Sequence, residues 1–398
     1  MLSKRDIATL KTGIPARKHI PILQHVLVQD RRVYATDMDL AVRIHAPDMN
    51  GSKGLVPFAR LVAAAKVGPT VAVKVTPGEE THEEMVRGEE WDSATHEYPP
   101  VLKPDGTPET KSVTTRWCDY AVNAGGQTAA GRTDVDPTEY PDVAAVFPAD
   151  ARLIVCAPVK AFRETLEAVA PAMPTDETRF SLCGVCIEPT RAIATDGHRL
   201  VAVPLAGWAV ARKDMPASMI LPADLVRAVL SGLPRTGDVT LGLAGDRVVI
   251  ECGAVAWSAR LVDAVYPDVD QVIPAEQAAD DVVCVFDPAA TVKALTAALK
   301  MAGYTRSSAP PVRLTIAEGV CTLEVNQLST DGEVRWGSPI PVAGEHRGSV
   351  VVGINGYYML DALAACGQGA VSVRMTDDLS PIRLDANGRI AIVMPIRV

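Results

Sequence analysis

The sequence predicts an α+β protein built from three copies of one domain, and repeated patterns are the reason. The segments YPDVAAVFP, from Tyr140, and YPDVDQVIP, from Tyr266, agree at six of nine positions. Upstream of each lies a second matched pair, ATDMDLAVRI from Ala35 and ATDGHRLVAV from Ala194. A strand, helix, turn and strand pattern then occurs three times along the chain. Repeats of this kind indicate duplication of a whole domain.

The three strand–helix–strand copies begin at Gly54, Ser218 and Val350. Each reads as an apolar strand, a short amphipathic helix, a Gly or Pro turn and an alternating strand. The two YPDV segments fall between successive copies and are rich in turn residues, so we interpret them as junctions between domains. The predicted domains are 1–149, 150–276 and 277–398.

Each domain also has an earlier helix. In the second domain Val159, Phe162, Leu166 and Val169 form one apolar stripe. In the third, Asp287 is the expected N-cap and is followed by Pro288 at the first helical position. The helices therefore bury one face and leave a polar face with several lysines and arginines.

One stretch interrupts the repeat. The first domain is longer than the second between its matched landmarks, and the excess lies in about 76–115, which is acidic and broken by Pro and Gly. We interpret this stretch as an exposed insertion, with a solvated loop favoured over a partner-binding segment.

Composition sets broad limits on function. The 398 residues carry a net charge of −9, eight scattered cysteines and 48% hydrophobic residues. This composition is typical of a soluble protein in the reducing cytoplasm, without a signal peptide or a membrane partner. An acidic total argues against nucleic acid binding over the whole surface, but a local basic track is compatible with it.

Enzyme motifs are mostly missing. The sequence has no Walker loop, G-x-G-x-x-G turn, G-x-S-x-G elbow or H-E-x-x-H pair. Cys183 and Cys186 have zinc-knuckle spacing without a second pair, so we expect core thiols, no metal and no cofactor. Asp196 and His198 could form an acid/base pair. The matching segment TDMDL retains the Thr and Asp but not the His or Arg, so we expect the Thr-Asp pair to be structural and the Gly-His-Arg part to serve binding.

The repeats and motifs together resemble the bacterial DNA polymerase III beta subunit, the beta sliding clamp. The resemblance rests on RFSLCGVCIE, AIATDGHRLVAV, YPDVDQVIP, IPILQHVLVQDRRVYATDMDLAVRI and the terminal VMPIRV, in the family's order. It implies three DNA-clamp (processivity-fold) domains, with helices lining a central hole and sheets outside. It also implies a homodimeric ring around double-stranded DNA, without sequence preference, that confers processivity in DNA replication and is no enzyme.

The resemblance further implies two sets of functional residues. A pocket for short peptides of the replicative polymerase and the clamp loader would contain Leu182, Thr195, Gly197, His198, Arg199, Leu200, Pro267, Val272, Ser380, Ile392, Met394, Pro395, Ile396, Arg397 and Val398. DNA would be contacted by Arg17, Lys18, Lys160, Arg163, Arg179, Phe180 and Arg227.

Departures from the family pattern leave alternatives open. Gln271 occupies a pocket position that is often basic, and the domain edge expected to meet the neighbouring subunit reads GGQTAAGRT, without a bulky apolar residue. The first strand before the first helix is missing or cut to a few residues. The alternatives are a monomeric peptide-binding adaptor and a hydrolase or nuclease that uses Asp196 and His198.

Overall fold

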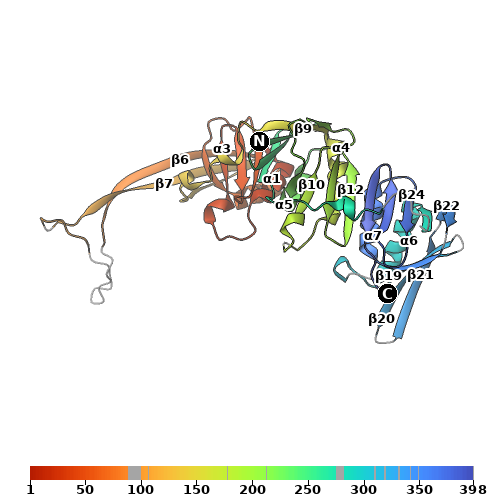
Figure 1. Cartoon of the computed structure of the whole chain (residues 1–398). Coiled ribbons are helices and arrows are strands. Elements are labelled where there is room, and N and C mark those ends of the chain that lie inside the picture. The colour runs from red at the N-terminus through yellow and green to blue at the C-terminus, as the bar shows by residue number, and fades with distance from the viewer. Residues whose placement is uncertain are drawn as a thin grey trace. The chain divides into compact units, whose positions relative to one another are not determined.

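The structure is a computed structural model of the whole chain (Figure 1). It describes residues 1–87, 100–105, 107–176, 178–211, 213–274, 282–308, 311–317, 320–329, 332–340, 342–347 and 349–397. The chain forms two compact units, Met1–Ala149 with Ala254–Trp257, and Asp150–Gly253 with Ser258–Val398. The division into three domains stays a prediction.

Unit 1 opens with a short strand and a capped helix. Strand β1 (Leu2–Ser3) pairs with β6, and helix α1 (Lys4–Leu10) follows it. The Asp6 N–H donates to the Ser3 hydroxyl at 3.1 Å, and the Ser3 N–H donates to the Asp6 carboxylate at 2.7 Å. This reciprocal capping box fixes where α1 begins, directly after a strand of only two residues.

Two antiparallel sets of strands complete unit 1. Strands β4, β3, β2 and β5 pair in that order, and β1, β6, β7 and β8 form a separate sheet in that order. The bounds are β2 (His25–Gln29), β3 (Arg32–Thr36), β4 (Leu40–His45), β5 (Gly54–Pro57), α2 (Phe58–Val67), β6 (Thr70–Met85), β7 (Thr110–Ala124), β8 (Gln127–Thr133) and α3 (Val143–Val146). Strand β8 is therefore at an edge of its sheet.

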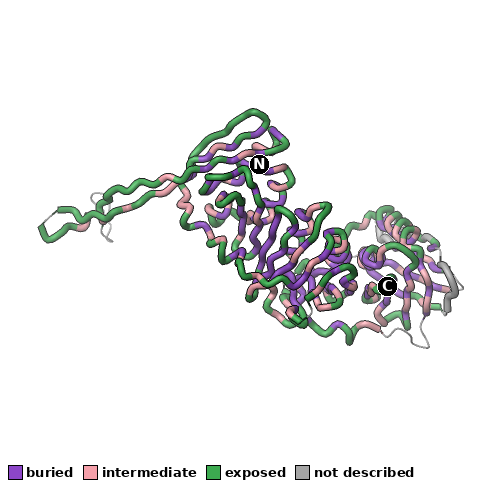
Figure 2. The backbone as a smooth tube through the Cα atoms, turned by 90° about the horizontal axis from the view of Figure 1, so that it is seen from above, coloured by how far each residue is buried: buried purple, intermediate pink, exposed green. Residues whose placement is uncertain are grey.

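The predicted insertion contains a two-stranded ribbon. Strands β6 and β7 stay paired out to Met85 and Thr110, and their outer halves are exposed on both faces (Figure 2). Cross-strand pairs stabilise the ribbon, for example Arg116 with Glu79 at 3.3 Å. The sequence predicted a loop here, and the paired part of the insertion is a ribbon instead. The prediction missed these strands because a polar strand without a buried face lacks the alternation of apolar and polar residues by which strands are recognised. Residues 88–99 and 106 of the insertion lie outside the described residues.

The first half of unit 2 repeats the pattern of unit 1. Its elements are β9 (Arg152–Pro158), α4 (Val159–Val169), β10 (Gly184–Ile187), β11 (Arg191–Thr195), β12 (Arg199–Pro204), β13 (Ala209–Val210), β14 (Met219–Pro222), α5 (Ala223–Gly232), β15 (Asp238–Ala244) and β16 (Arg247–Cys252). Strand β17 (Val255–Arg260) follows, and its residues up to Trp257 belong to unit 1. The predicted apolar stripe of α4 is confirmed, because its four members are each at most 3% exposed.

The second half of unit 2 begins with the expected capped helix. The Asp287 carboxylate accepts the Ala289 N–H at 2.8 Å, as predicted for an N-cap. The elements are β18 (Val282–Phe286), α6 (Pro288–Met301), β19 (Pro311–Ala317), β20 (Val320–Ser329), β21 (Gly332–Ile340), β22 (Val342–Arg347), β23 (Val350–Asn355), α7 (Gly356–Cys366), β24 (Val371–Met375), β25 (Ile382–Ala386) and β26 (Arg389–Val393).

The three predicted strand–helix–strand copies are confirmed as β5–α2–β6, β14–α5–β15 and β23–α7–β24. Val71, Val239 and Val371 lie at the start of the second strand of each copy and are completely buried. In unit 2 a long sheet runs in the order β14, β10, β11, β12, β26, β25, β24, β18, β22. The pairing of β12 with β26 brings Leu200 opposite Ile392 and sets the C-terminal strand beside the TDGHRL segment.

Candidate functional site

The TDGHRL segment forms a tight turn between β11 and β12. The Thr195 hydroxyl donates to the Arg199 carbonyl at 2.6 Å and accepts the Gly197 N–H at 3.1 Å. The Asp196 carboxylate accepts the N–H groups of His198 and Arg199 at 2.9 and 3.0 Å. Local hydrogen bonds of this type are how Thr and Asp stabilise turns.

The matched turn of unit 1 has the same bonds. The Thr36 hydroxyl donates to the Leu40 carbonyl at 2.9 Å and accepts the Met38 N–H at 3.0 Å. The Asp37 carboxylate accepts the Leu40 N–H at 2.7 Å. The prediction that the Thr-Asp pair is structural is therefore confirmed. Both carboxylate oxygens of Asp196 already have partners, since the second accepts from Arg199 Nε at 3.0 Å.

Beside this turn lies an apolar groove of about 470 Å³. Nine residues of the predicted pocket line it: Leu182, Thr195, Gly197, Arg199, Leu200, Pro267, Val272, Ile392 and Met394. The lining also contains Asp268, Val269, Gln271, Ile273, Pro274 and Pro381. Of these, Gln271 alone was singled out from the sequence. The other junction residues are missed because the sequence does not reveal which side of the junction faces the groove, and Pro381 is missed because it lies in a separate loop before β25.

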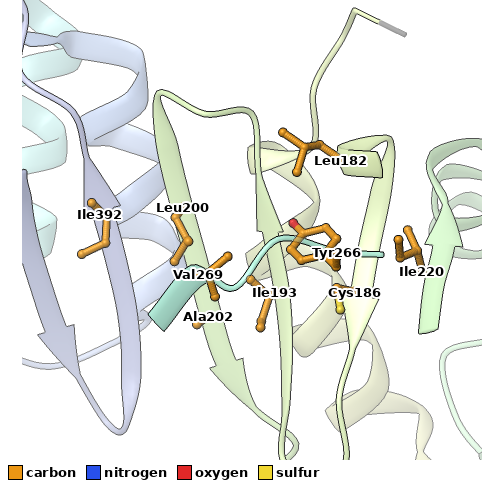
Figure 3. Packing of buried hydrophobic residues seen from close by; sticks show 9 residues of the cluster. All are labelled: Leu182, Cys186, Ile193, Leu200, Ala202, Ile220, Tyr266, Val269 and Ile392. Carbon is orange, nitrogen blue, oxygen red and sulfur yellow. The ribbon is translucent and has the colours of Figure 1, made fainter. Parts of the chain in front are cut away.

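The floor of the groove is a buried cluster (Figure 3). Leu200 and Ile392 lie on adjacent strands, and Val269 packs across them from the junction segment. Each of the three is at most 4% exposed. Val272 and Met394, in contrast, are 55% and 36% exposed. Buried apolar floor and exposed apolar rim together make a surface suited to apolar side chains of a ligand.

The wall of the groove is the junction segment from Tyr266 to Pro274. Tyr266 is buried, and Asp268 caps the short helical turn η6 (Val269–Gln271) by accepting the Asp270 N–H at 3.1 Å. In unit 1 the other YPDV copy is built alike, since Tyr140 is buried and Asp142 accepts the Ala144 N–H at 2.9 Å. The repeated motif therefore encodes a buried tyrosine followed by a capped turn.

The remaining predicted pocket residues lie elsewhere. Strand β26 ends at Val393, and the Met394 N–H donates to the His198 carbonyl at 2.9 Å. Ile396 donates its N–H to the Gly353 carbonyl at 2.8 Å instead of lining the groove. Ser380 N–H donates to Asp377 at 2.6 Å. Neither Pro395 nor Arg397 lines the groove, and His198 lines a different cleft. Val398 lies outside the described residues.

An ion cluster lies next to the turn. The Asp361 carboxylate of α7 binds both Arg199 of β12 and Arg306, whose guanidinium makes two hydrogen bonds of 2.8 Å. Arg199 also lies 4.3 Å from the ring centroid of Tyr358. Burial, and then the charge of Asp196, raises the pKa of Tyr358. Such a network of buried charge needs complete pairing, and it links β12 to α7.

The predicted DNA-contacting residues fall into three groups. Arg17 and Lys18 lie on an exposed loop of unit 1 between two short helical turns, η1 (Lys11–Gly13) and η2 (Pro21–Gln24). On α4, the Lys160 side chain is 85% exposed. Arg163 is engaged, because its guanidinium donates to the carbonyls of Leu230 and Leu233 at 3.1 and 2.6 Å. These hydrogen bonds favour a role for Arg163 in packing α4 against the end of α5.

The third group lies near the groove. Arg179 donates to the Asp196 carbonyl at 2.8 Å, and its neighbour Phe180 is 60% exposed. Arg227 pairs with Asp224 at 2.7 Å, and its side chain is 55% exposed. These side chains are accessible to a charged ligand.

Metal and membrane candidates find little support. Cys186 is buried in β10, and burial raises the pKa of its thiol to about 12. Within the described part of the chain, no three His, Cys, Asp or Glu side chains gather as metal ligands would. No helix among the same residues has the length and apolar character to cross a membrane.

Known proteins resemble this chain along most of its length. Residues 157–268 match the central domain of the DNA polymerase III beta subunit. A beta sliding clamp of Chlamydia pneumoniae is 23% identical over 61% of this chain, and one of Caulobacter vibrioides is 28% identical over 57%. The matched segments span 64% and 61% of those two proteins.

A solved structure shares the fold. The sliding clamp of Bartonella birtlesii, a DNA polymerase III subunit beta, superposes with a TM-score of 0.71 at 20% identity and covers 98% of this chain and 97% of its own. The expected α+β clamp fold is thereby confirmed. Together these likenesses relate residues 157–268 to the central domain of the DNA polymerase III beta subunit and the chain as a whole to the fold of the solved sliding clamps.

Proposed function

We propose that the protein is a DNA sliding clamp, a non-catalytic ring that encircles duplex DNA and tethers a replicative polymerase. Two copies would bind head to tail and form the ring in the cytoplasm, and a clamp loader would place the ring on DNA. The relatives that bear the name beta sliding clamp and the match to the central domain support this reading. A ring holds DNA by topology, so an acidic protein of net charge −9 can serve without tight contacts.

The observation that carries the proposal is the apolar groove. A tether must hold its partner at one defined surface. Nine of the residues predicted to bind partner peptides line a single groove of about 470 Å³. Its apolar lining suits an extended peptide with an apolar end, whose side chains would cover Leu200, Val272 and Met394.

Two open sheet edges support closure of a ring. Strand β8 is the last strand of its sheet, and Gln127–Arg132 are exposed. Strand β21 is the last strand of the four-stranded sheet β21, β20, β19, β23. An edge strand pairs readily with another chain, so β8 of one copy would pair with β21 of a second. Because side chains such as Ala129 and Ala130 are small, the main chain would provide most of this contact. We therefore expect a weak ring.

The groove is tested by peptide binding and the ring by light scattering across a concentration series. We expect peptides with capped termini and an apolar end to bind the unaltered protein. They should bind the variant Leu200→Asp with lower affinity. Full affinity of that variant would contradict the groove. For the ring, we expect a dimer at tens of micromolar. A strict monomer there would favour the alternative, a peptide-binding adaptor without a ring.

An enzyme is the third candidate. Asp196 is only 12% exposed and binds Arg199, which is an arrangement typical of a structural carboxylate. We therefore expect no nucleolytic turnover with any divalent metal. A reproducible metal-dependent cleavage that is lost in Asp196→Asn would contradict the non-catalytic assignment.

A further inference from the structure

The ribbon formed by the outer halves of β6 and β7 is held firmly at the point where it leaves the sheet of unit 1 (Figure 2). Trp117 lies against Gly78 of the facing strand, because a Cβ built on Gly78 would meet the Trp117 indole at 2.5 Å. The Arg132 guanidinium of β8 lies 4.5 Å from the Trp117 ring centroid and donates to Asp119 at 2.8 Å. An aromatic side chain over a glycine of the neighbouring strand fixes the register of the two strands.

The opposite face of the ribbon has a second set of contacts at the same place. Arg116 donates to Glu79 on the facing strand and to Asp136, both at 3.3 Å. Further out, every residue of β6 from Glu79 to Met85 is exposed. An isolated two-stranded ribbon is marginally stable in water. A ribbon that is fixed at its base and buries neither face is therefore expected to find its contacts in another molecule.

The two edges of the ribbon differ in how they are protected from further pairing. The outer half of β6 contains Pro77, which cannot donate to another strand. It also contains four glutamates, Glu79, Glu80, Glu83 and Glu84. Proline and charged residues are the usual means by which proteins keep an edge strand from pairing. The outer half of β7 has no proline and no acidic residue, and its stretch Ser112–Thr115 is uncharged and favours strands. The β7 edge is therefore the one that is open to a partner.

This open edge lies on the β8 side of the sheet. The strand order is β1, β6, β7, β8, and within the described residues β8 pairs with β7 from Ala124 to Cys118. Beyond Cys118 the main chain of β7 is itself the edge on that side. From there to Thr110 it stays paired with β6, over roughly 27 Å at the usual rise of a strand. A molecule that docks on β8 thus meets the ribbon beside it.

Strand β8 alone is too small for a stable interface. Six of its residues, Gln127–Arg132, are exposed. A stable protein interface involves about 20–30 residues on each side. The outer halves of β6 and β7 continue the same sheet, and they would supply much of the remaining surface.

We infer that the ribbon is a dimerisation arm, which packs on a second copy of this chain beside the β8 contact and strengthens the ring. The uncharged stretch of β7 would face the sheet that ends in β21 of the second copy and would offer it main-chain and hydroxyl hydrogen bonds. The β6 edge, with its proline and glutamates, would face solvent and discourage unspecific pairing. The inference rests on the proposed function, because it concerns the same ring.

The first test removes the arm and keeps its base. In the shortened variant, residues 80–115 are replaced by Asn-Gly, a two-residue turn that joins the directly opposed pair Glu79 and Arg116. Sedimentation velocity across a concentration series measures the dissociation constant of the dimer. We expect that constant to rise about tenfold or more in the shortened variant, because most of the interface residues are lost. Cooperative thermal unfolding of the variant should report that the rest of the protein is folded.

A matched pair of variants tests which edge makes the contact. Ser112→Lys with Thr114→Lys adds two charges to β7, opposite Glu83 and Thr81, and so leaves the ribbon paired. Thr81→Lys with His82→Lys adds two charges to β6 instead. Both variants lose the hydrogen bond of 3.0 Å between the Thr81 and Thr114 hydroxyls. We expect the β7 variant to dissociate more readily than the unaltered protein and the β6 variant to behave as the unaltered protein does.

The outcomes are distinct. If the unaltered protein stays monomeric at tens of micromolar, the ring fails and the inference fails with it. If the unaltered protein and the shortened variant dimerise equally well, the inference alone is wrong. Equal dissociation of the two double-lysine variants would contradict the assignment of the contact to β7. If the shortened variant dimerises normally but loses affinity for duplex DNA, the arm serves nucleic acid and the inference is also wrong.

Discussion

Arg191 binds the carboxylate of Asp270 with two hydrogen bonds of 2.7 and 3.0 Å and so ties the groove wall to β11. This bond lowers the pKa of the Asp270 carboxyl, and hydrogen bonding to Arg191 is the main cause. A second arginine, Arg383 of β25, donates to the Pro274 carbonyl at the other end of the wall. Between these two points lie Gln271, Val272 and Ile273, which line the groove.

The variant Arg191→Leu should therefore weaken peptide binding more than it weakens the fold. A peptide would have to order the loosened wall, so we expect an affinity loss of roughly threefold to tenfold. Thermal unfolding should change only moderately. The pair with Asp270 contributes less than about 1 kcal/mol because Asp270 is 63% exposed, and the variant also removes the pair of Arg191 with Glu188 at 2.7 Å. Arg260→Leu is the control, since Arg260 also pairs with an exposed carboxylate, Asp246, at 3.7 Å. Equal affinity for both variants would contradict a role of Arg191 in holding the wall.

Replacement of the turn glycine Gly197 should displace the Arg179 side chain in addition to straining the backbone. Gly197 has φ +85°, but Met38 adopts φ 88° in the matched turn of unit 1 with a full side chain. Gly197→Ala should lower the free energy of unfolding only slightly more than Gly245→Ala, where φ is +58° and nothing lies within 4 Å of the new Cβ. The difference should not exceed the roughly 1 kcal/mol of the hydrogen bond from Arg179 to the Asp196 carbonyl, because the exposed Arg179 side chain can move away from the new Cβ. Left-handed strain alone costs about 1–2 kcal/mol.

The background variant Arg179→Ala isolates the clash. In that background, urea unfolding should give Gly197→Ala and Gly245→Ala similar costs. An excess cost of Gly197→Ala that persists without the Arg179 side chain would show that the contact with Arg179 is irrelevant.

Unit 1 should lose stability in mild acid because of His25. Its ring nitrogens bind the Pro21 carbonyl at 3.0 Å and the Thr133 hydroxyl at 2.9 Å, and burial lowers its pKa from 6.5. The folded protein binds this proton less well than the unfolded chain. The stabilising effect is therefore complete above about pH 6.5 and is lost as the pH falls below that value toward the lowered pKa.

Thermal unfolding between about pH 7.5 and 5.5 measures this effect. The unaltered protein should melt at lower temperature as the pH falls, and His25→Gln should flatten that dependence while being less stable at pH 7.5. An identical dependence in the two proteins would remove His25 as the cause.

The terminal segment allows a sharp comparison. Deletion of Met394–Val398 should abolish peptide binding and leave folding and dimer formation nearly intact. Met394→Ser should account for most of that loss, roughly 2 kcal/mol, because Met394 lines the groove rim. Ile396→Ser should bind peptides almost normally, since Ile396 pairs with Gly353 instead. Calorimetry with one peptide measures all three, and a larger loss for Ile396→Ser would place the pocket wrongly.

Local patterns in the sequence predicted the local structure well. The α4 stripe, the Asp287 cap and the Thr-Asp turns depend on residues within a few positions of one another, and such bonds form wherever the backbone conformation recurs. The repeat added information, because TDMDL lacks the His and Arg of TDGHRL and so separated structural residues from those special to unit 2.

Contacts between distant segments could not be predicted in the same way. Arg163 reads as a free cation on a polar helix face, but the end of α5 supplies carbonyl acceptors. Arg306 and Arg199 are far apart in the sequence and lie together because both pair with Asp361. Both contacts depend on how distant elements pack against one another, and this packing is not visible in the order of residues.

The central claim is that the protein holds DNA by encircling it. Retention on circular duplex DNA compared with the same DNA linearised tests this directly, with the protein loaded on both forms and then diluted into high salt to remove phosphate contacts. We predict that the protein stays on the circle and slides off the linear form, and that Arg17→Ala with Arg179→Ala reduces salt-sensitive binding without abolishing this difference. Equal retention on the two forms would contradict a sliding clamp.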